Sequence, residues 1–241
     1  MKKGVVLPLA LLVLAAAAPS ARADTWRVPK GKTWTWSFAA DTLGHAPDGS
    51  HVLGGRWIVV LDSTRAPEAA ARVDSSEADS SATGDSTAAA WPRVLRQAED
   101  NDGVVFHMIQ LPKPLLHDLE ISVRFRIRSG EIDPTAGVAF QLDPKGRNGY
   151  VVRVSGEKSE LMAHYLLSGK RRDLKYEKID RPEAGAWHTL EIRRVGATMD
   201  VSYDGKPRFR LRDERYQEGT IGLWTEDDTI ADFADLTVRS L

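Results

Sequence analysis

The sequence contains no cysteine, which excludes disulfides, zinc–thiolate sites and cysteine nucleophiles. No apolar run beyond residue 23 is long enough to span a bilayer. An excess of either charge is lacking too, because 33 Lys and Arg stand against 34 Asp and Glu, interspersed along the chain. Since nucleic-acid-binding proteins carry a basic footprint, we expect no nucleic-acid partner. A cysteine-free domain must be stabilised by its own core.

Several common catalytic signatures are also missing. The sequence has no Gly-x-Ser-x-Gly elbow, no His-Glu-x-x-His pair and no phosphate-binding glycine loop. None of the six histidines forms a pair at helical ligand spacing. Any metal site would have to be built from positions that lie far apart in the sequence.

The first 23 residues have the pattern of a secretory signal peptide. Lys2 and Lys3 precede an apolar stretch over 5–18, and a small-x-small site ends at Ala23. We expect cleavage before Asp24, export to the periplasm or the medium, and no stable membrane insertion afterwards. The alternative is an uncleaved anchor, but the apolar run is shorter than the ~20 residues that a spanning helix needs. Cleavage removes three bases and no acid, which takes the net charge from −1 to −4.

The remaining chain, 24–241, is expected to form one domain with a flexible insertion at about 62–90. The centre of that segment reads DSSEADSSATGDSTAAA and has few large apolar residues. Such a composition buries too little apolar area to offset the entropy of ordering. A linker between two domains is the alternative, but the part before it is too short for an independent domain.

Alternating apolar and polar residues predict β-strands through the rest of the chain. Leu119, Ile121, Val123, Phe125 and Ile127 alternate with polar residues, which is the pattern of a strand with one buried face. Turn pairs such as Asp-Gly at 204–205 separate the runs and indicate hairpins. Many short strands at this spacing predict an all-β, two-sheet sandwich. The segment 92–99 is the one weak helix candidate, of a turn or two.

A series of short motifs carries a resemblance to a known family. The motifs are Asp41-x-x-Gly44-x-x-Pro47-x-Gly49, Trp57-x-Val59, Gly137-x-x-Phe140, Tyr150-Val151-Val152-Arg153, Gly169-Lys170-Arg171, Trp187-His188-x-Leu190 and Gly222-Leu223-Trp224-Thr225. In this order they resemble the concanavalin A-like lectin/glucanase jelly roll, and more narrowly the secreted 3-keto-disaccharide hydrolase-type and laminin G-like domains. The resemblance implies an antiparallel jelly-roll sandwich.

The sequence departs from that family at several chemically important positions. Glucan-cleaving members resemble one another in a Glu-x-Asp-x-x-Glu strand motif, but Glu131 and Asp133 are followed by Ala136. Gln141 stands where an arginine is common, and His164 stands near an expected tyrosine. Two functions remain open. One is binding of a glycan or a cell-envelope partner without catalysis, and the alternative is processing of a glycoside.

A ligand-binding groove is predicted from polar and aromatic residues that alternate away from the core. Arginine and amide groups bond sugar hydroxyls, and aromatic rings pack on sugar C–H faces. We expect the groove on one concave sheet, with Trp224 outward-facing and exposed. In the alternative, the arginines form a solvated, ion-paired sheet face. The candidate residues are Arg124, Arg126, Gln141, Arg153, His164 and Trp224.

The acidic loop near the C-terminus suggests a structural Ca²⁺ ion, because hard cations prefer carboxylates. Its candidate ligands are Asp228 and Asp235, and no other cofactor is expected. In the alternative, Asp228 caps a turn in a solvated loop. Trp34 and Trp187 are expected in the core, and His188 is expected to be a hydrogen-bonded core histidine.

Overall fold

The computed structural model describes residues 30–64, 91–101, 105–112 and 114–241. The predicted signal peptide and most of the predicted insertion lie outside these residues. No helix occurs in the described segments, so they hold no apolar helix that could cross a membrane.

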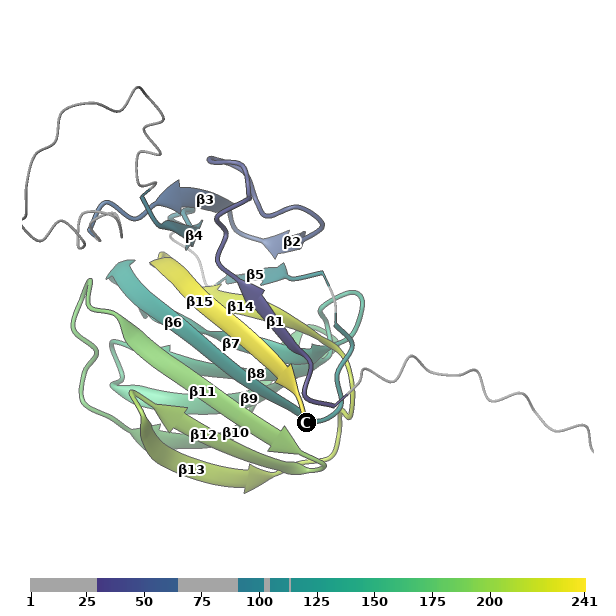
Figure 1. Ribbon diagram of the computed structural model, residues 1–241. Helices are drawn as coiled ribbons and strands as arrows, with labels where there is room; N and C mark the ends of the chain where they lie inside the picture. Colours follow the sequence, from purple (N-terminus) through teal and green to yellow (C-terminus); the bar gives the residue numbers. More distant parts are fainter. Residues whose placement is uncertain (1–29, 65–90, 102–104, 113) are drawn as a thin grey trace, which may run out of the picture.

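The strands form two antiparallel sheets packed face to face (Figure 1). One is an eight-stranded sheet in the order β13-β12-β11-β6-β15-β4-β3, with β1 also paired to β15. Its strands are β1 Thr33–Trp36, β3 Trp57–Leu61, β4 Arg93–Gln97, β6 Leu119–Ser129, β11 His188–Val195, β12 Thr198–Tyr203, β13 Lys206–Arg212 and β15 Ile230–Ser240.

The second sheet has seven strands in the order β10-β9-β8-β7-β14-β5-β2. Its strands are β2 His51–Gly54, β5 Phe106–Gln110, β7 Thr135–Leu142, β8 Gly149–Ser155, β9 Glu160–Leu167, β10 Lys170–Lys178 and β14 Thr220–Glu226. The chain crosses repeatedly between the two sheets. The prediction of an antiparallel jelly-roll sandwich is confirmed.

One apolar core fills the space between the sheets. In β6 the predicted alternation is observed, with Leu119, Ile121, Val123 and Phe125 almost completely buried. The seven-stranded sheet contributes the facing residues, including Val138. Because a one-residue shift would turn every apolar side chain outward, this burial fixes the strand register.

The predicted hairpin between β12 and β13 is present. Asp204 and Gly205 have φ of 50° and 70°, the pair of positive values that a type I′ turn requires. Glycine is suited to such a conformation because it has no Cβ. The turn therefore joins two strands whose pairing the sequence predicts.

The helix expectation for 92–99 is wrong, because this segment forms strand β4. Val94 and Leu95 are buried, and β4 pairs with both β3 and β15. Pairing with a strand on each side supplies long-range hydrogen bonds, which the local sequence of this short segment does not predict. The N–H of Asp62 donates to the carbonyl of Pro92 at 2.7 Å, which closes the base of the β3–β4 hairpin.

Candidate functional site

The outer face of the seven-stranded sheet collects half of the predicted ligand residues. Arg153 lies on β8, His164 on β9 and Trp224 on β14. Arg124 and Arg126 lie on β6, in the other sheet, so the prediction of one shared groove is wrong for them. Alternation separates core-facing from outward-facing residues, but it does not say to which sheet a strand belongs.

Arg153 is the centre of a buried polar network on this face. Its side chain is completely buried. Its Nε lies 3.1 Å from Glu226 Oε1 and 3.1 Å from His164 Nε2. Its Nη1 donates to Thr135 Oγ1 at 3.0 Å and lies 3.5 Å from Asp133 Oδ2. Within the described residues its Nη2 has no hydrogen-bond partner. One nitrogen of a buried guanidinium therefore has no acceptor for its N–H groups.

A glycine on the strand between them allows the Arg153 side chain to reach Glu226. Arg153 and Glu226 lie on β8 and β14, with β7 between them, and the β7 residue that pairs with Arg153 is Gly137. A Cβ at Gly137 would come within 2.7 Å of the Arg153 Cβ. The missing side chain leaves room for the guanidinium to pass over β7 towards β14.

His164 is held in its neutral form. Burial, reinforced by the nearby cations Arg153 and Arg171, lowers its pKa from 6.5 to about 3, against the opposing effect of Asp173. Its Nε2 accepts from Arg153, so the proton lies on Nδ1, which donates to Asp173 Oδ1 at 2.9 Å. Burial also lowers the pKa of Arg153, opposed by the Glu226 carboxylate.

The seven-stranded sheet curls so that its outer face is concave. The guanidinium carbon of Arg171, on β10, lies 5.2 Å from the ring centroid of Phe106, on β5. These strands are five places apart in the sheet. At about 4.8 Å per strand, a flat sheet would separate them by roughly 24 Å, more than one side chain can span. Arg171 also pairs with Glu226 on β14, and so crosses the hollow over β9, β8 and β7.

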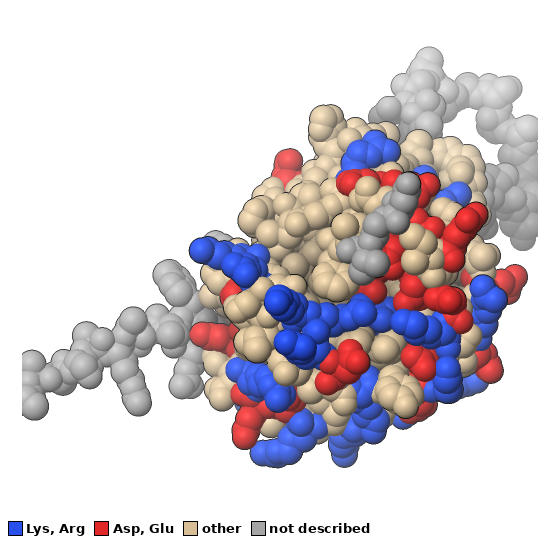
Figure 2. All heavy atoms as spheres, turned by 180° about the vertical axis from the view of Figure 1, so that it is seen from behind, with Lys and Arg blue, Asp and Glu red and all other residues tan. Residues whose placement is uncertain are grey.

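Figure 2 shows this face, with a band of Lys and Arg side chains crossing it beside a group of acidic residues. We call Arg153, His164, Arg171, Asp173 and Glu226 the concave cluster. Its aromatic neighbours are Phe106 and Trp224. Arg171, Asp173 and Glu226 are not among the ligand residues predicted from the sequence. Asp173 reaches the cluster through the pairing of β10 with β9, and Arg171 reaches Glu226 through the curvature of the sheet.

Trp224 faces away from the main core as predicted, but it is only 1% exposed, so the prediction of an exposed contact surface is wrong. It belongs to a second apolar cluster with Met108 and Val151. Its ring lies 4.8 Å from that of Phe106, and its Nε1 donates to Glu226 Oε1 at 2.8 Å. Among the described residues, the exposed aromatic residue of this face is Tyr176 on β10, at 64%.

Gln141 has a structural position at the opposite end of β7. It lies in a β-bulge with φ of 50°, and its Nε2 donates to the carbonyls of His117 and Gln217, both at 2.9 Å. It therefore ties two loops to the sheet. The structure does not place it in the concave cluster.

Arg124 and Arg126 match the alternative of an ion-paired sheet face. Arg126 lies 2.8 Å from Asp62 and 2.7 Å from Asp232, and Arg124 lies 2.8 Å from Asp235. Both guanidiniums lie over the ring of Trp187, at 4.8 and 4.6 Å.

The core predictions for aromatic residues had different outcomes. Trp187 packs on the two arginines of β6 rather than in the core, so that prediction is wrong. Trp34 is partly buried against the core, which agrees with its prediction. His188 stacks on Tyr203 and lies 2.8 Å from Asp204 through Nδ1, as expected for a hydrogen-bonded core histidine.

The two candidate calcium ligands are not brought together. The Asp228 carboxylate accepts from the backbone N–H groups of Glu131 and Ile132, whereas Asp235 is paired with Arg124. At about 3.3 Å per residue, the extended segment of β15 from Ile230 to Asp235 alone spans about 17 Å. Among the described residues, no three His, Asp or Glu side chains are grouped to hold a metal ion.

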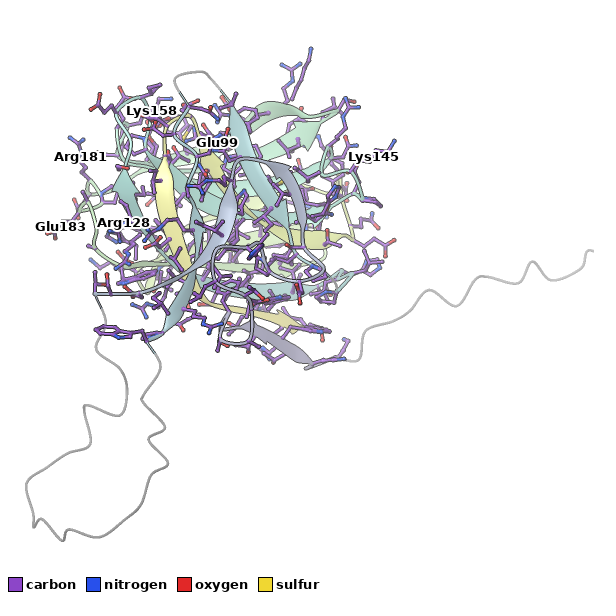
Figure 3. The ribbon with its side chains drawn as sticks, turned by 90° about the horizontal axis from the view of Figure 1, so that it is seen from above. Glu99, Arg128, Lys145, Lys158, Arg181 and Glu183 are labelled. Carbon is purple, nitrogen blue, oxygen red and sulfur yellow. The ribbon has the colours of Figure 1, made fainter. Side chains whose placement is uncertain are left out.

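A separate pocket of about 370 Å³ lies at one end of the sandwich, where β6 passes into β7. Figure 3 shows Arg181 and Glu183 at this end with Arg128, far from Lys145. The apolar lining of this pocket includes Ile127, Pro134 and Pro182. The neighbouring loop carries Asp133 towards Arg153, so the pocket adjoins the concave cluster without sharing its buried residues.

These features define an antiparallel jelly-roll β-sandwich. The carbohydrate-binding module CBM66 from Bacillus subtilis is similar to it in structure, with a TM-score of 0.59 and 16% identity over 80% of this chain and 96% of the module. The Ca²⁺-bound exoplasmic/lumenal domain of VIP36 has a TM-score of 0.50 and 12% identity over 63% of this chain and 80% of that domain. No protein-family model and no curated protein matches the sequence.

Proposed function

We propose that this protein is an exported module that binds carbohydrate on the concave face of its seven-stranded sheet. The observation that carries the proposal is the Nη2 of the buried Arg153, which has no hydrogen-bond partner among the described residues and belongs to the guanidinium that shares Glu226 with Arg171. A buried guanidinium donor without an acceptor costs free energy, and a ligand hydroxyl supplies an acceptor. A structurally similar protein is named a carbohydrate-binding module, which supports this choice.

The exposed groups around the concave cluster suit a sugar. The ring of Tyr176 offers a flat apolar face, and the Asp173 carboxylate, 79% exposed, accepts hydrogen bonds from hydroxyls. The Arg171 side chain is 24% exposed, so a ligand in the hollow can reach it and compete for its contacts with Glu226 and Phe106.

A glycan panel, followed by calorimetry on each hit, tests the proposal. Tyr176→Ala removes an exposed ring, so we expect at least tenfold weaker binding with unchanged thermal stability. Trp91→Ala is the matched control, because Trp91 is 42% exposed and lies outside the concave face. Equal affinities of the two variants for every bound glycan would contradict this location of the site, and the absence of any bound glycan would contradict the function.

Export rests on the N-terminal pattern. We propose that the chain is delivered to the periplasm or the medium after cleavage before Asp24. N-terminal sequencing of the protein from a secreting host should begin at Asp24. An intact Met1 in the fractionated protein would refute this part of the proposal.

Glycoside processing is a second candidate, favoured by Asp227. Burial, reinforced by the neighbouring Glu226, raises the pKa of this carboxyl, which is how a general acid is prepared. If glycosides that bind are also cleaved, Asp227→Asn should abolish cleavage and retain binding. Intact glycoside after prolonged incubation with the wild-type protein would leave binding as the function.

A further inference from the structure

The two edge strands on one side of the sandwich carry an unusual share of the positive charge. Strand β10 reads KRRDLKYEK and strand β13 reads KPRFRLR. Together they hold nine Lys and Arg against two acids, which leaves 24 bases and 32 acids for the rest of the chain. A nearly neutral protein is therefore polarised, with a strongly basic edge.

The two strands form a single surface. β10 ends the seven-stranded sheet and β13 ends the eight-stranded sheet, and they meet along the same side of the sandwich (Figure 1). Lys175 Nζ donates to the Arg210 carbonyl at 3.4 Å, and Arg208 lies 3.8 Å from Glu177. We call this surface the basic edge.

Much of this charge is not used inside the protein. Within the part of the chain that the structure describes, Lys170, Arg172, Lys206 and Arg212 are all exposed and have no carboxylate partner within 4.0 Å. Lysines on edge strands also prevent sheets from pairing edge to edge. That role needs few charges, whereas here seven exposed cations line two short strands.

We propose that the basic edge binds an acidic polysaccharide, one that carries repeated carboxylate or sulfate groups. The edge is narrow and linear: nine residues of β10 extend about 30 Å at roughly 3.3 Å per residue. This shape fits an extended polymer better than a membrane plane.

The edge is also continuous with the concave cluster through Arg171, which lies on β10 and reaches Glu226. The choice of a polysaccharide rests on the proposed function. The anionic character rests on the basic edge alone.

The test compares two polymers with one backbone, polygalacturonate and its fully methyl-esterified form, by calorimetry. We expect the charged form to bind at least tenfold more tightly, with an advantage that shrinks as salt is raised from 20 to 300 mM, since salt screens exposed charges. The triple variant Arg172→Gln, Lys206→Gln, Arg212→Gln should weaken binding of the charged polymer about tenfold, because each exposed charge contact contributes modestly.

The matched control changes three exposed bases outside the edge, Lys30→Gln, Arg56→Gln and Lys145→Gln. It should bind the charged polymer within twofold of wild type. Equal loss in both triple variants would mean that net charge alone matters, and would overturn the assignment to this edge.

Three further results would also overturn the inference. One is equal affinity for the charged and esterified polymers, which leaves the proposed function intact. Another is tight binding of phosphatidylglycerol vesicles or duplex DNA with no binding of polygalacturonate or of heparin. The last is self-association of the edge variant by size exclusion with unchanged affinity, which would show that the cations only protect the edges. If no glycan, neutral or charged, bound to the protein, the proposed function would be rejected instead.

Discussion

One carboxylate oxygen on the concave face accepts three side-chain donors. Glu226 Oε1 is contacted by Arg153, Arg171 and Trp224, two of them cations. Three converging donors hold this carboxylate in one place and align the rings and guanidiniums around it. The geometry of the concave face therefore depends on a few buried side chains, whose removal affects folding as well as binding.

Trp224→Ala should destabilise the fold rather than act on binding alone. Trp224 is almost completely buried and packs on Phe106, so its truncation leaves a cavity. Core Trp→Ala changes cost about 3–5 kcal/mol. Urea unfolding measures the difference, with the exposed Trp91→Ala as a control expected within about 0.5 kcal/mol of wild type. A loss below 1 kcal/mol for Trp224→Ala would contradict the observed burial.

His164 should make the fold less stable as the pH falls. Its pKa is about 3 in the folded protein and 6.5 as the unperturbed value. Between these values the unfolded chain binds a proton that the folded protein does not, so stability decreases from pH 6.5 downward, by about 1.4 kcal/mol per pH unit for one full proton.

His164→Gln removes this proton and keeps an acceptor for Arg153. Unfolding by urea at pH 7, 6, 5 and 4 should give a shallower decline for the variant than for wild type. Burial also lowers the pKa of His107, but His107 is present in both proteins and cancels in the comparison. Parallel declines in the two proteins would show that His164 does not remain neutral in the fold.

At the scale of elements, backbone hydrogen bonds among described residues close the base of the β3–β4 hairpin. Val60 pairs with Val94, and the Asp62 N–H bonds to the Pro92 carbonyl. Arg126 holds the same base from β6 through Asp62, at 2.8 Å, and through Thr64. These contacts hold the ends of β3 and β4 together at the base of the hairpin.

Replacing residues 66–89 with a short Gly/Ser linker should leave the melting temperature unchanged or slightly raised. Loop closure becomes easier by about 0.6 kcal/mol for each halving of length. Asp62→Ala is the contrasting variant: it removes a buried charged partner of Arg126 and should cost about 1.5–3 kcal/mol. A linker variant less stable than Asp62→Ala would mean that the replaced segment contributes to the fold.

At the scale of the whole molecule, the two ends of the described chain lie side by side. The Gly31 N–H donates to the Ser240 carbonyl, and the Ser240 N–H donates to the Lys32 carbonyl, both at 2.9 Å. β15 lies at the centre of its sheet, between β6 and β4, and also pairs with β1. The last strand is thus part of the core of the fold.

A circular permutant should fold because joining the two ends preserves the backbone hydrogen bonds between them. Leu241 is joined to Lys30 by a short linker, and new ends are opened within 65–90. We expect a cooperative thermal transition within a few degrees of wild type and the same glycan affinity. An insoluble permutant, alongside a stable linker-replacement variant, would show that the order of strand addition matters as well as the final contacts.

The sequence by itself determined the fold class and much of the in–out pattern. Alternation has a period of two, so it reports which face of β6 is buried, and the Asp204-Gly205 pair reports its turn without any other part of the chain. These are local properties of backbone geometry. Placing Arg153 on an outward face followed from the same rule.

Tertiary structure decided which outward residues share a surface. Arg126 and Arg153 have the same local pattern, yet they lie on different sheets because strand order depends on long-range pairing. Trp224 is buried because the sheet curls and Phe106 covers it, and Arg171 reaches Glu226 for the same reason. Sheet curvature accumulates from small twists over several strands, so no single segment of the sequence specifies it.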